Sequence, residues 1–490
     1  MNWRQTLLFG LVSALAPACF ALSGSEGGGQ ILTPASRTMN HGDVALPRGF
    51  AIDLISNHLT FPTSVTFDDQ GDVYVTESGY SYGEVFGVPR LLRLREGEAP
   101  EVIASGDNGP WTGVTFYGGA FYVAEGGVKS GGKILRIERD GKITALVEGL
   151  PSFGDHQTNG PAIGKDGFIY FSQGTATNAA VVGPDNAEFG WLKRHPEFHD
   201  VPCRDLALTG ANFDSDNPLT ADEHDRTSTG PYSAFGHAAA PGQIIAGRVP
   251  CNGAVMRVPV RGGPVELVAW GFRNPFGLAF APDGALYATD NGYDDRGSRA
   301  VFGAADVLWR VQPGAWYGWP DFSESRPIYE DAIWKDHYRV PGKATPPRLL
   351  AQPPSRPPEP SALFPVHCSA DGLDFSRSTE FGYVGQAFVA LFGDQSPTVG
   401  KTLEPVGFKV VRVDVKSGVM TDFAVNRSKK AGPASKIRGG GLERPVAVRF
   451  DPSGRSLYVV DFGVVTVSDR ETKPRPGTGT VWRISRPEGS

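Results

Sequence analysis

The chain has 490 residues, a formal net charge of −6 at pH 7, 63 glycines, 40 prolines and 11% aromatic residues. This length fits several small domains or one large closed array of repeats, and the glycine and proline content indicates many tight turns. The mild, dispersed charge, with no run of Lys and Arg, argues against nucleic acid or an anionic membrane as a partner.

The first residues are typical of an export signal. Arg4 provides the positive start, residues 7–15 form a short apolar core, and Ala18 or Ala21 ends a cleavage site. The apolar run is short for a bilayer-spanning helix, although an N-terminal membrane anchor is the alternative interpretation. We therefore predict a signal peptide over residues 1–21, a mature chain without a membrane span, and a periplasmic or secreted location.

A sequence motif that predicts two strands joined by a turn rich in Gly and Asp occurs six times, at a spacing of about 45–50 residues with two longer gaps. The copies begin at Pro62, Pro110, Gly160, Asn274, Asp371 and Arg444. Each copy continues into a third strand and often a fourth, which predicts an all-β, six-bladed β-propeller over residues 45–487 as a single domain. We expect residues 50–58 to supply the outer strand of the sixth unit and so close the ring.

Two long segments interrupt the repeats. Residues 179–250 are polar and rich in Gly, Asn and Asp, and residues 320–365 are rich in Pro. We interpret both as long surface insertions between strands, of the kind that are usually functional or disordered. Cys203 and Cys251 bracket the first, and an oxidising compartment would let them form a disulfide at its base; free thiols are the alternative. The sequence has no CxxC or CxxCH motif, which argues against a zinc ribbon or covalently attached haem.

Polar residues flank the inner strands at one rim of the predicted ring. Because neighbouring strands are antiparallel, the start of each first strand and the end of each second strand meet at that rim. These residues are Asn108, Asp155, His156, Gln157, Arg273, Asn274, His367 and Arg444 before the first strands, and Glu77, Glu125, Gln173, Asp290, Asn291, Gly292, Asp394 and Asp461 after the second. We expect many of them to converge on one pocket mouth. The alternative is that they are turn and cap residues, with the carboxylates bound to backbone amides or to the arginines.

Three stretches resemble the soluble pyrroloquinoline quinone (PQQ) sugar dehydrogenases, the glucose/sorbosone dehydrogenase family. They are "DHQTNGPAIGKDGFIYFSQGTATN" from Asp155, "WGFRNPFGLAFAPDGALYATDNGYDD" from Trp270 and "ADVLWRVQPGAWYGWPDF" from Ala305. The pairing of "DHQ" before the third unit with "RNPFGLAF" before the fourth is the most specific part. The resemblance implies oxidation of an aldose or related sugar by hydride transfer to PQQ, assisted by Ca²⁺, with a separate cytochrome or quinone as electron acceptor.

The resemblance also implies roles for individual residues. His156 matches the general base, and Arg273 matches the arginine at the reactive quinone carbonyl. Cofactor-binding positions correspond to Arg273, Asn274, Arg444, His367 and Lys401, substrate-binding positions to Asp155, Asn108 and Gln157, and Ca²⁺-binding main-chain carbonyls to Gly292 and Tyr293. The residue types suit the reaction, because a neutral His accepts a hydroxyl proton and an Arg or Ca²⁺ stabilises a developing oxyanion.

The chain departs from the family in its fifth unit. The family places a cofactor-binding lysine directly after the second strand, whereas this chain has Asp394 and Gln395 there, and only Lys401 could reach back. Phe364 or His367 would take the place of an aromatic residue that some members hold over the quinone.

Two other functions stay open from the sequence. One is a calcium-dependent lactonase or esterase that binds its metal through Glu77, Glu125, Asp290 and Asp461. The other is a non-catalytic propeller that binds a glycan or a protein through its long insertions.

Overall fold

The computed structural model describes residues 35–79, 87–188, 190–333, 344–400, 402–467 and 472–487. The predicted signal peptide and Lys401 lie outside the described residues. No helix within the described ranges has the length and apolar character needed to cross a membrane.

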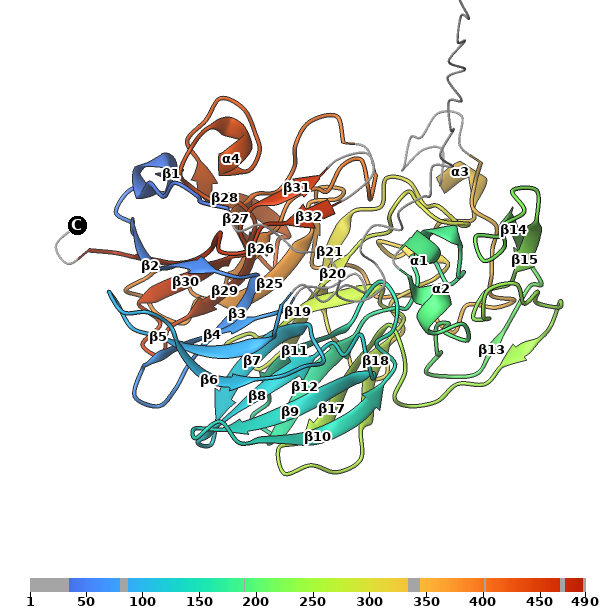
Figure 1. Cartoon of the computed structure of the whole chain (residues 1–490), viewed down its shortest axis with the longest axis horizontal. Helices are drawn as coiled ribbons and strands as arrows, with labels where there is room; N and C mark the ends of the chain where they lie inside the picture. Colours follow the sequence, from blue (N-terminus) through green and yellow to red (C-terminus); the bar gives the residue numbers. More distant parts are fainter. Residues whose placement is uncertain are drawn as a thin grey trace, which may run out of the picture.

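Six sheets surround one axis, which confirms the predicted all-β, six-bladed propeller (Figure 1). Each innermost strand contacts the innermost strand of the next sheet, and the last contacts the first, so the ring is closed. The innermost strands are, in order, β3, β7, β11, β19, β25 and β29, with the bounds given below.

The first three blades have four antiparallel strands each. Blade 1 consists of β3 (Pro62–Phe67), β4 (Val73–Glu77), β5 (Arg90–Leu94) and β6 (Glu101–Ser105). Blade 2 consists of β7 (Trp111–Tyr117), β8 (Ala120–Glu125), β9 (Gly132–Glu138) and β10 (Ile143–Leu150). Blade 3 consists of β11 (Thr158–Ile163), β12 (Phe168–Gln173), β17 (Ala254–Pro259) and β18 (Glu266–Trp270).

The last three blades include the two places where the N-terminal part of the chain joins later sheets. Blade 4 consists of β19 (Asn274–Phe280), β20 (Leu286–Asn291), β21 (Asp306–Arg310) and β24 (Ala362–Phe364). Blade 5 consists of β25 (Ala370–Phe375), β26 (Ala387–Leu391), β27 (Lys409–Asp414), β28 (Val419–Asn426) and the short β1 (Val44–Ala45), which follows the 3₁₀ turn η1 (His41–Asp43). Blade 6 consists of β29 (Pro445–Phe450), β30 (Ser456–Asp461), β33 (Gly479–Ser485) and β2 (Ala51–Leu59). The pairing of β2 with β33 confirms the predicted ring closure.

The second strand of a blade is the most buried because sheets pack against both of its faces. Every residue of β8 and of β26 is buried, and their sequences, AFYVAE and AFVAL, are continuous apolar runs apart from the terminal Glu125. Neighbouring blades are joined by aromatic contacts such as the one between Tyr74 and Phe121, whose ring centroids are 4.5 Å apart. Such inter-sheet packing replaces a single central core.

The innermost strands approach one another closely along the channel. In every blade the pairing of the first and second strands contains a register shift near the start of the first strand. A Cβ atom on Gly113 of β7 would lie 1.6 Å from the carbonyl oxygen of Gly160 in β11. Glycine is therefore required there, and the irregular strand starts redirect side chains at the rim.

The two insertions, each between two strands of one blade, contain short helices and strand pairs of their own and contact each other. The first carries α1 (Pro184–Glu188), α2 (Trp191–Arg194), the pair β13 (Leu206–Ala207) and β16 (Ile244–Ile245), and the pair β14 (Phe213–Asp216) and β15 (Arg226–Thr229). The second carries the pair β22 (Phe322–Ser323) and β23 (Arg326–Pro327), and α3 (Asp331–Ile333). Figure 1 shows α1, α2, α3 and β13–β15 gathered on one side of the molecule. An isolated bridge between Leu208 and Leu350, both buried, joins the two insertions.

Cys203 and Cys251 form the predicted disulfide at the base of the first insertion. Blade 6 carries a further hairpin, β31 (Val465–Val467) with β32 (Thr472–Pro474), and α4 (Ala434–Ile437) precedes that blade. The hairpin begins at the rim, where Val465 borders the pocket described next.

Candidate functional site

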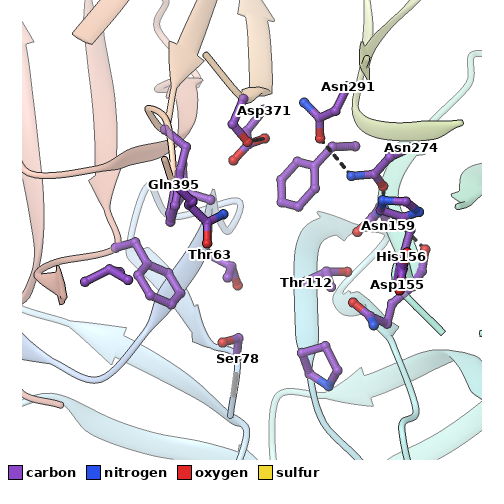
Figure 2. Close-up of a pocket in the computed structure, with 18 residues that line it drawn as sticks. Thr63, Ser78, Thr112, Asp155, His156, Asn159, Asn274, Asn291, Asp371 and Gln395 are labelled. Atoms are coloured by element: carbon purple, nitrogen blue, oxygen red, sulfur yellow. Dashed lines mark hydrogen bonds between the residues drawn. The ribbon is translucent and has the colours of Figure 1, made fainter. Parts of the chain in front are cut away.

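A pocket of about 120 Å³ lies at the mouth of the central channel, at the rim where the inner strands begin. Every blade contributes at least one lining residue; in blade order these include Thr63, Thr112, Asn159, Asn274, Asp371 and Val446. Figure 2 shows His156, Asn159, Asn274 and Asn291 along one side of the hollow, and Thr63, Ser78 and Gln395 along the other. The predicted convergence of polar side chains at one mouth therefore occurs, although with a partly different set of residues.

A chain of amide hydrogen bonds shapes the polar side of the pocket. Asn159 Nδ2 donates to Asn274 Oδ1 at 3.4 Å, Asn274 Nδ2 donates to Asn291 Oδ1 at 2.7 Å, and Asn291 Nδ2 donates to the Ala370 carbonyl at 3.1 Å. These hydrogen bonds connect blade 3 through blade 4 to blade 5, so they fix the three side-chain amides relative to one another.

Apolar rings and a buried acid complete the lining. Phe276, Phe392 and Phe462 are the aromatic members of the pocket wall. Burial raises the pKa of Asp371 well above its ordinary value, which favours the neutral carboxyl that donates hydrogen bonds. The positive charge of Arg444 opposes this shift but does not outweigh burial.

His156 lines the pocket and is held in one orientation by its backbone and its ring. It lies just before β11, where its N–H donates to the Thr175 carbonyl at 3.2 Å as an extension of the β11–β12 pairing. Its Nδ1 lies 2.9 Å from the same carbonyl oxygen and 3.1 Å from Thr175 Oγ1. Because a carbonyl oxygen only accepts, Nδ1 of the neutral ring carries the proton and Nε2 keeps its lone pair.

The imidazole is neutral at physiological pH. Burial lowers the pKa of His156 well below its usual value, and the positive charge of Arg273 lowers it further. A neutral, Nδ1-protonated imidazole at a pocket wall is a base that can accept a proton at Nε2.

Arg273 lies beside His156 rather than across the opening from it. The Thr175 N–H donates to the Arg273 carbonyl at 2.8 Å, which joins the segment after β12 of blade 3 to the residue before β19 of blade 4. The buried guanidinium donates to Asp294 Oδ2 at 2.8 Å and to Asn178 Oδ1 at 2.9 Å. Its charge therefore acts on the pocket from behind the wall that His156 and Asn274 form.

A buried ion network continues from Arg273. Asp294 also accepts from Arg296, whose remaining nitrogens donate to Asp155 at 2.8 Å and Asp185 at 2.7 Å. Burial opposes ionisation of Asp294, but Arg273 and Arg296 outweigh it and lower its pKa to about 2. Asp155, a predicted substrate-binding residue, is among the residues that line the pocket, while its side chain is 0% exposed and its carboxylate is bound within this network.

The other predicted substrate-binding residues differ in their location. Gln157 lines the pocket, and its Nε2 donates to the Gly154 carbonyl at 3.1 Å. Asn108 is buried behind the rim, where it donates to Glu125 at 2.8 Å and accepts from the backbone N–H of Lys129 at 3.1 Å. Asn108 therefore shapes a loop of blade 2.

The other described cofactor and metal positions that the sequence predicts are not among the residues that line the pocket. Arg444 donates to the carbonyls of Gly393 and Asp394 and packs over the Phe392 ring, 4.9 Å from its centroid. His367 has a positive φ of 61° and lies close to Gly400. The Gly292 N–H donates to Asp306 at 2.8 Å, and the Tyr293 hydroxyl donates to the Phe322 carbonyl at 3.0 Å.

The four carboxylates considered as metal ligands act as caps instead. Glu77 accepts from the Thr60 N–H, and Glu125 accepts from Trp111 Nε1. Asp290 accepts from the N–H groups of Arg273 and Asn274, and Asp461 from those of Glu443 and Arg444. Within the described ranges no group of three or more His, Cys, Asp or Glu side chains could hold a metal ion.

Sequence reasoning missed several residues of the site. Four of them lie at the irregular starts of inner strands: Thr63, Thr112, Asn159 and Phe276. Because the pairing is irregular there, a strict two-residue alternation does not indicate which side chains face the channel. The rim rule does not select Thr175, which binds the His156 ring. A signal for it exists in the "QGTATN" segment directly after β12, because a polar run at that rim position lies beside the "DHQ" segment.

Comparison with known proteins confirms the family resemblance. Residues 246–364 match the family model described as Glucose / Sorbosone dehydrogenase. No curated protein matches the chain.

Solved structures share the fold. The holo form of the pyranose dehydrogenase PQQ domain from Coprinopsis cinerea is 16% identical, with a TM-score of 0.55 over 94% of this chain and 99% of that chain. The calcium structure of a Trichoderma reesei carbohydrate-active enzyme of family AA12 is 16% identical, with a TM-score of 0.51 over 94% and 100% of the two chains. The apo form of the soluble aldose sugar dehydrogenase from Escherichia coli is 13% identical, with a TM-score of 0.50 over 89% and 100%. At these identities the likeness establishes the propeller fold.

Proposed function

We propose that this protein is a dehydrogenase that oxidises an aldose or a related sugar by hydride transfer to PQQ. The observation that carries the proposal is the neutral His156 at the channel mouth, with Nδ1 bound to the Thr175 carbonyl and Arg273 directly behind it. The match of residues 246–364 to the glucose/sorbosone family and the names of the structural neighbours support it.

The residues of the pocket fit PQQ by the chemistry of their donors. PQQ is a flat dicarbonyl with three carboxylates, and the pocket offers phenyl faces together with amide and hydroxyl groups that donate hydrogen bonds. Arg273 precedes the lining residue Asn274 and Arg444 packs over the lining residue Phe392, so two guanidinium groups lie next to the wall. We assign Arg273, Asn274 and Arg444 to binding the cofactor, which when bound accepts the hydride.

His156 then acts as general base. Its Nε2 accepts the hydroxyl proton of the sugar as the hydride leaves carbon, and its bond to Thr175 keeps the ring oriented during that transfer. The hydroxyl and amide groups of Thr63, Thr112 and Gln157 are suited to bind the remaining hydroxyls of a sugar.

For Ca²⁺ we propose the main-chain carbonyls of Gly292 and Tyr293 as ligands. The described carboxylates do not form a metal-binding cluster, whereas Ca²⁺ readily takes backbone carbonyl and amide oxygens. The same proposal includes a periplasmic or secreted location, supported by the disulfide between Cys203 and Cys251, and a separate cytochrome or quinone as acceptor.

A reconstitution experiment tests the proposal. The purified chain is titrated with PQQ and Ca²⁺, and the spectrum of bound quinone and dye reduction are followed with a panel of aldoses. We expect a saturable bound-quinone spectrum and sugar-dependent reduction. A protein that shows neither, or that hydrolyses lactones without quinone, refutes the assignment.

A further inference from the structure

One peptide group connects His156 to a buried carboxylate that comes from the first insertion. The carbonyl of the Thr175–Ala176 peptide accepts from His156 Nδ1 at 2.9 Å. The N–H of the same peptide, on Ala176, donates to Asp200 Oδ1 at 2.6 Å. Two hydrogen bonds therefore connect the Asp200 carboxyl group, through this one peptide group, to the His156 imidazole.

Asp200 also holds the neighbouring turn. Its Oδ2 accepts from Thr177 Oγ1 at 2.6 Å, while Thr175 Oγ1, which lies next to the imidazole, donates to the Thr177 carbonyl at 2.7 Å. The residue is 1% exposed, and both of its oxygens bind the segment that positions His156.

We propose that Asp200 is a positioning residue for His156 and acts through the Thr175–Ala176 peptide. The inference rests on the proposed role of His156 as base. Burial raises the pKa of Asp200 to about 7, against the hydrogen bonds from Thr177 and Ala176, so the carboxylate form predominates above that pH. A carboxylate bound to the N–H of a peptide polarises the carbonyl of that peptide, which then becomes a stronger acceptor for the imidazole N–H. Such an outer partner fixes the tautomer and the ring orientation and raises the basicity of the other nitrogen.

The insertion is built to keep Asp200 in place. The next residue, Val201, donates its N–H to Asn252 Oδ1 at 2.9 Å, and Asn252 Nδ2 donates to the Gly174 carbonyl at 2.9 Å. Residues 200 and 252 flank the disulfide-bonded Cys203 and Cys251. Asp200 and Asn252, at the base of the insertion, thus both bind the segment 174–177. This insertion therefore has a part in the proposed active site.

The test compares Asp200→Asn, Asp200→Ala and the control Asp205→Asn. The assays are run at pH 8, above the pKa of about 7 of Asp200, where Asn keeps an acceptor for the Ala176 N–H but removes the charge, and Ala removes both. Asp205 is an exposed carboxylate of the same insertion that accepts from the Gly247 N–H at 2.8 Å. We expect kcat to fall about tenfold for Asn and about 100-fold for Ala, with KM and the Kd for PQQ changed less than about twofold and Asp205→Asn at the parent value.

A second readout does not depend on turnover. Nitrogen NMR of histidine-labelled protein, assigned with a His156→Gln variant, reports whether Nδ1 or Nε2 carries the proton. We expect a single Nδ1-protonated form in the parent and a mixture of tautomers in Asp200→Ala. An unchanged His156 tautomer in Asp200→Ala overturns the inference whether or not the parent oxidises sugars. A parent without sugar oxidation, but with a tautomer that depends on Asp200, refutes only the proposed function.

Discussion

The disulfide at the base of the first insertion gives a quantitative prediction. The double variant Cys203→Ala/Cys251→Ala opens a loop whose ends are 48 residues apart in sequence. The entropy of closing a loop of that length in the unfolded chain corresponds to about 4 kcal/mol at 25 °C. Because Asp200 and Asn252 lie beside the two cysteines, we expect the loss to fall first on the insertion and on the 174–177 turn.

Urea unfolding and limited proteolysis measure this effect. We expect the double variant to be about 4 kcal/mol less stable in the transition that includes the insertion, and to be cleaved first within residues 203–251. Reductant should destabilise the parent to the level of the variant and leave the variant unchanged. A loss below about 1 kcal/mol, with cleavage sites unchanged, would refute the claim that the bridge holds the insertion against the site.

Three further predictions concern the site and the ring. His156→Gln should lower sugar-dependent turnover by about two to four decades while quinone binding persists, and near-parent turnover would remove it from the role of base. Gly113→Ala should cost about 3 kcal/mol or more in thermal or urea unfolding, because its Cβ would lie 1.6 Å from a carbonyl of blade 3, whereas Gly87→Ala, with no atom within 4 Å, should be neutral. Asp294→Asn should lower the free energy of unfolding by roughly 2 kcal/mol at pH 7, because ionised Asp294 is stabilised in the folded state, where its pKa is about 2 against an ordinary 3.8. That stabilisation is lost as the pH falls from about 4 towards 2, so parent and variant curves that stay parallel over this range would contradict the ion pairing with Arg273.

The repeats of the sequence were sufficient to predict the architecture. Each copy carries its own strand and turn signals, and each sheet needs a neighbour on both faces, so six copies lead to a closed ring. The same reasoning placed residues 50–58 at the outer edge of blade 6, where β2 pairs with β33. The cysteine spacing around a long polar segment likewise predicted the disulfide.

The candidate site was only partly predictable. Position at the rim brought Asp155, His156, Gln157 and Asn274 to one mouth, but the same rule also selected Asn108 and the capping carboxylates, which do not line the pocket. These residues occupy equivalent positions in the repeat, and what separates them is the partner that each one meets. Asp155 meets Arg296, 141 residues away, and its carboxylate is therefore held within the protein.

The sequence by itself determined the number of blades, the closure of the ring and the rim at which polar residues gather, because these depend on local strand and turn preferences repeated six times. Only the tertiary structure decided which rim residues face the channel and which form ion pairs or accept hydrogen bonds from backbone N–H groups. It also revealed Asp200 behind His156. The reason is physical: a hydrogen bond or an ion pair depends on distances of a few ångströms between segments that are remote in the chain, and no local pattern encodes those distances.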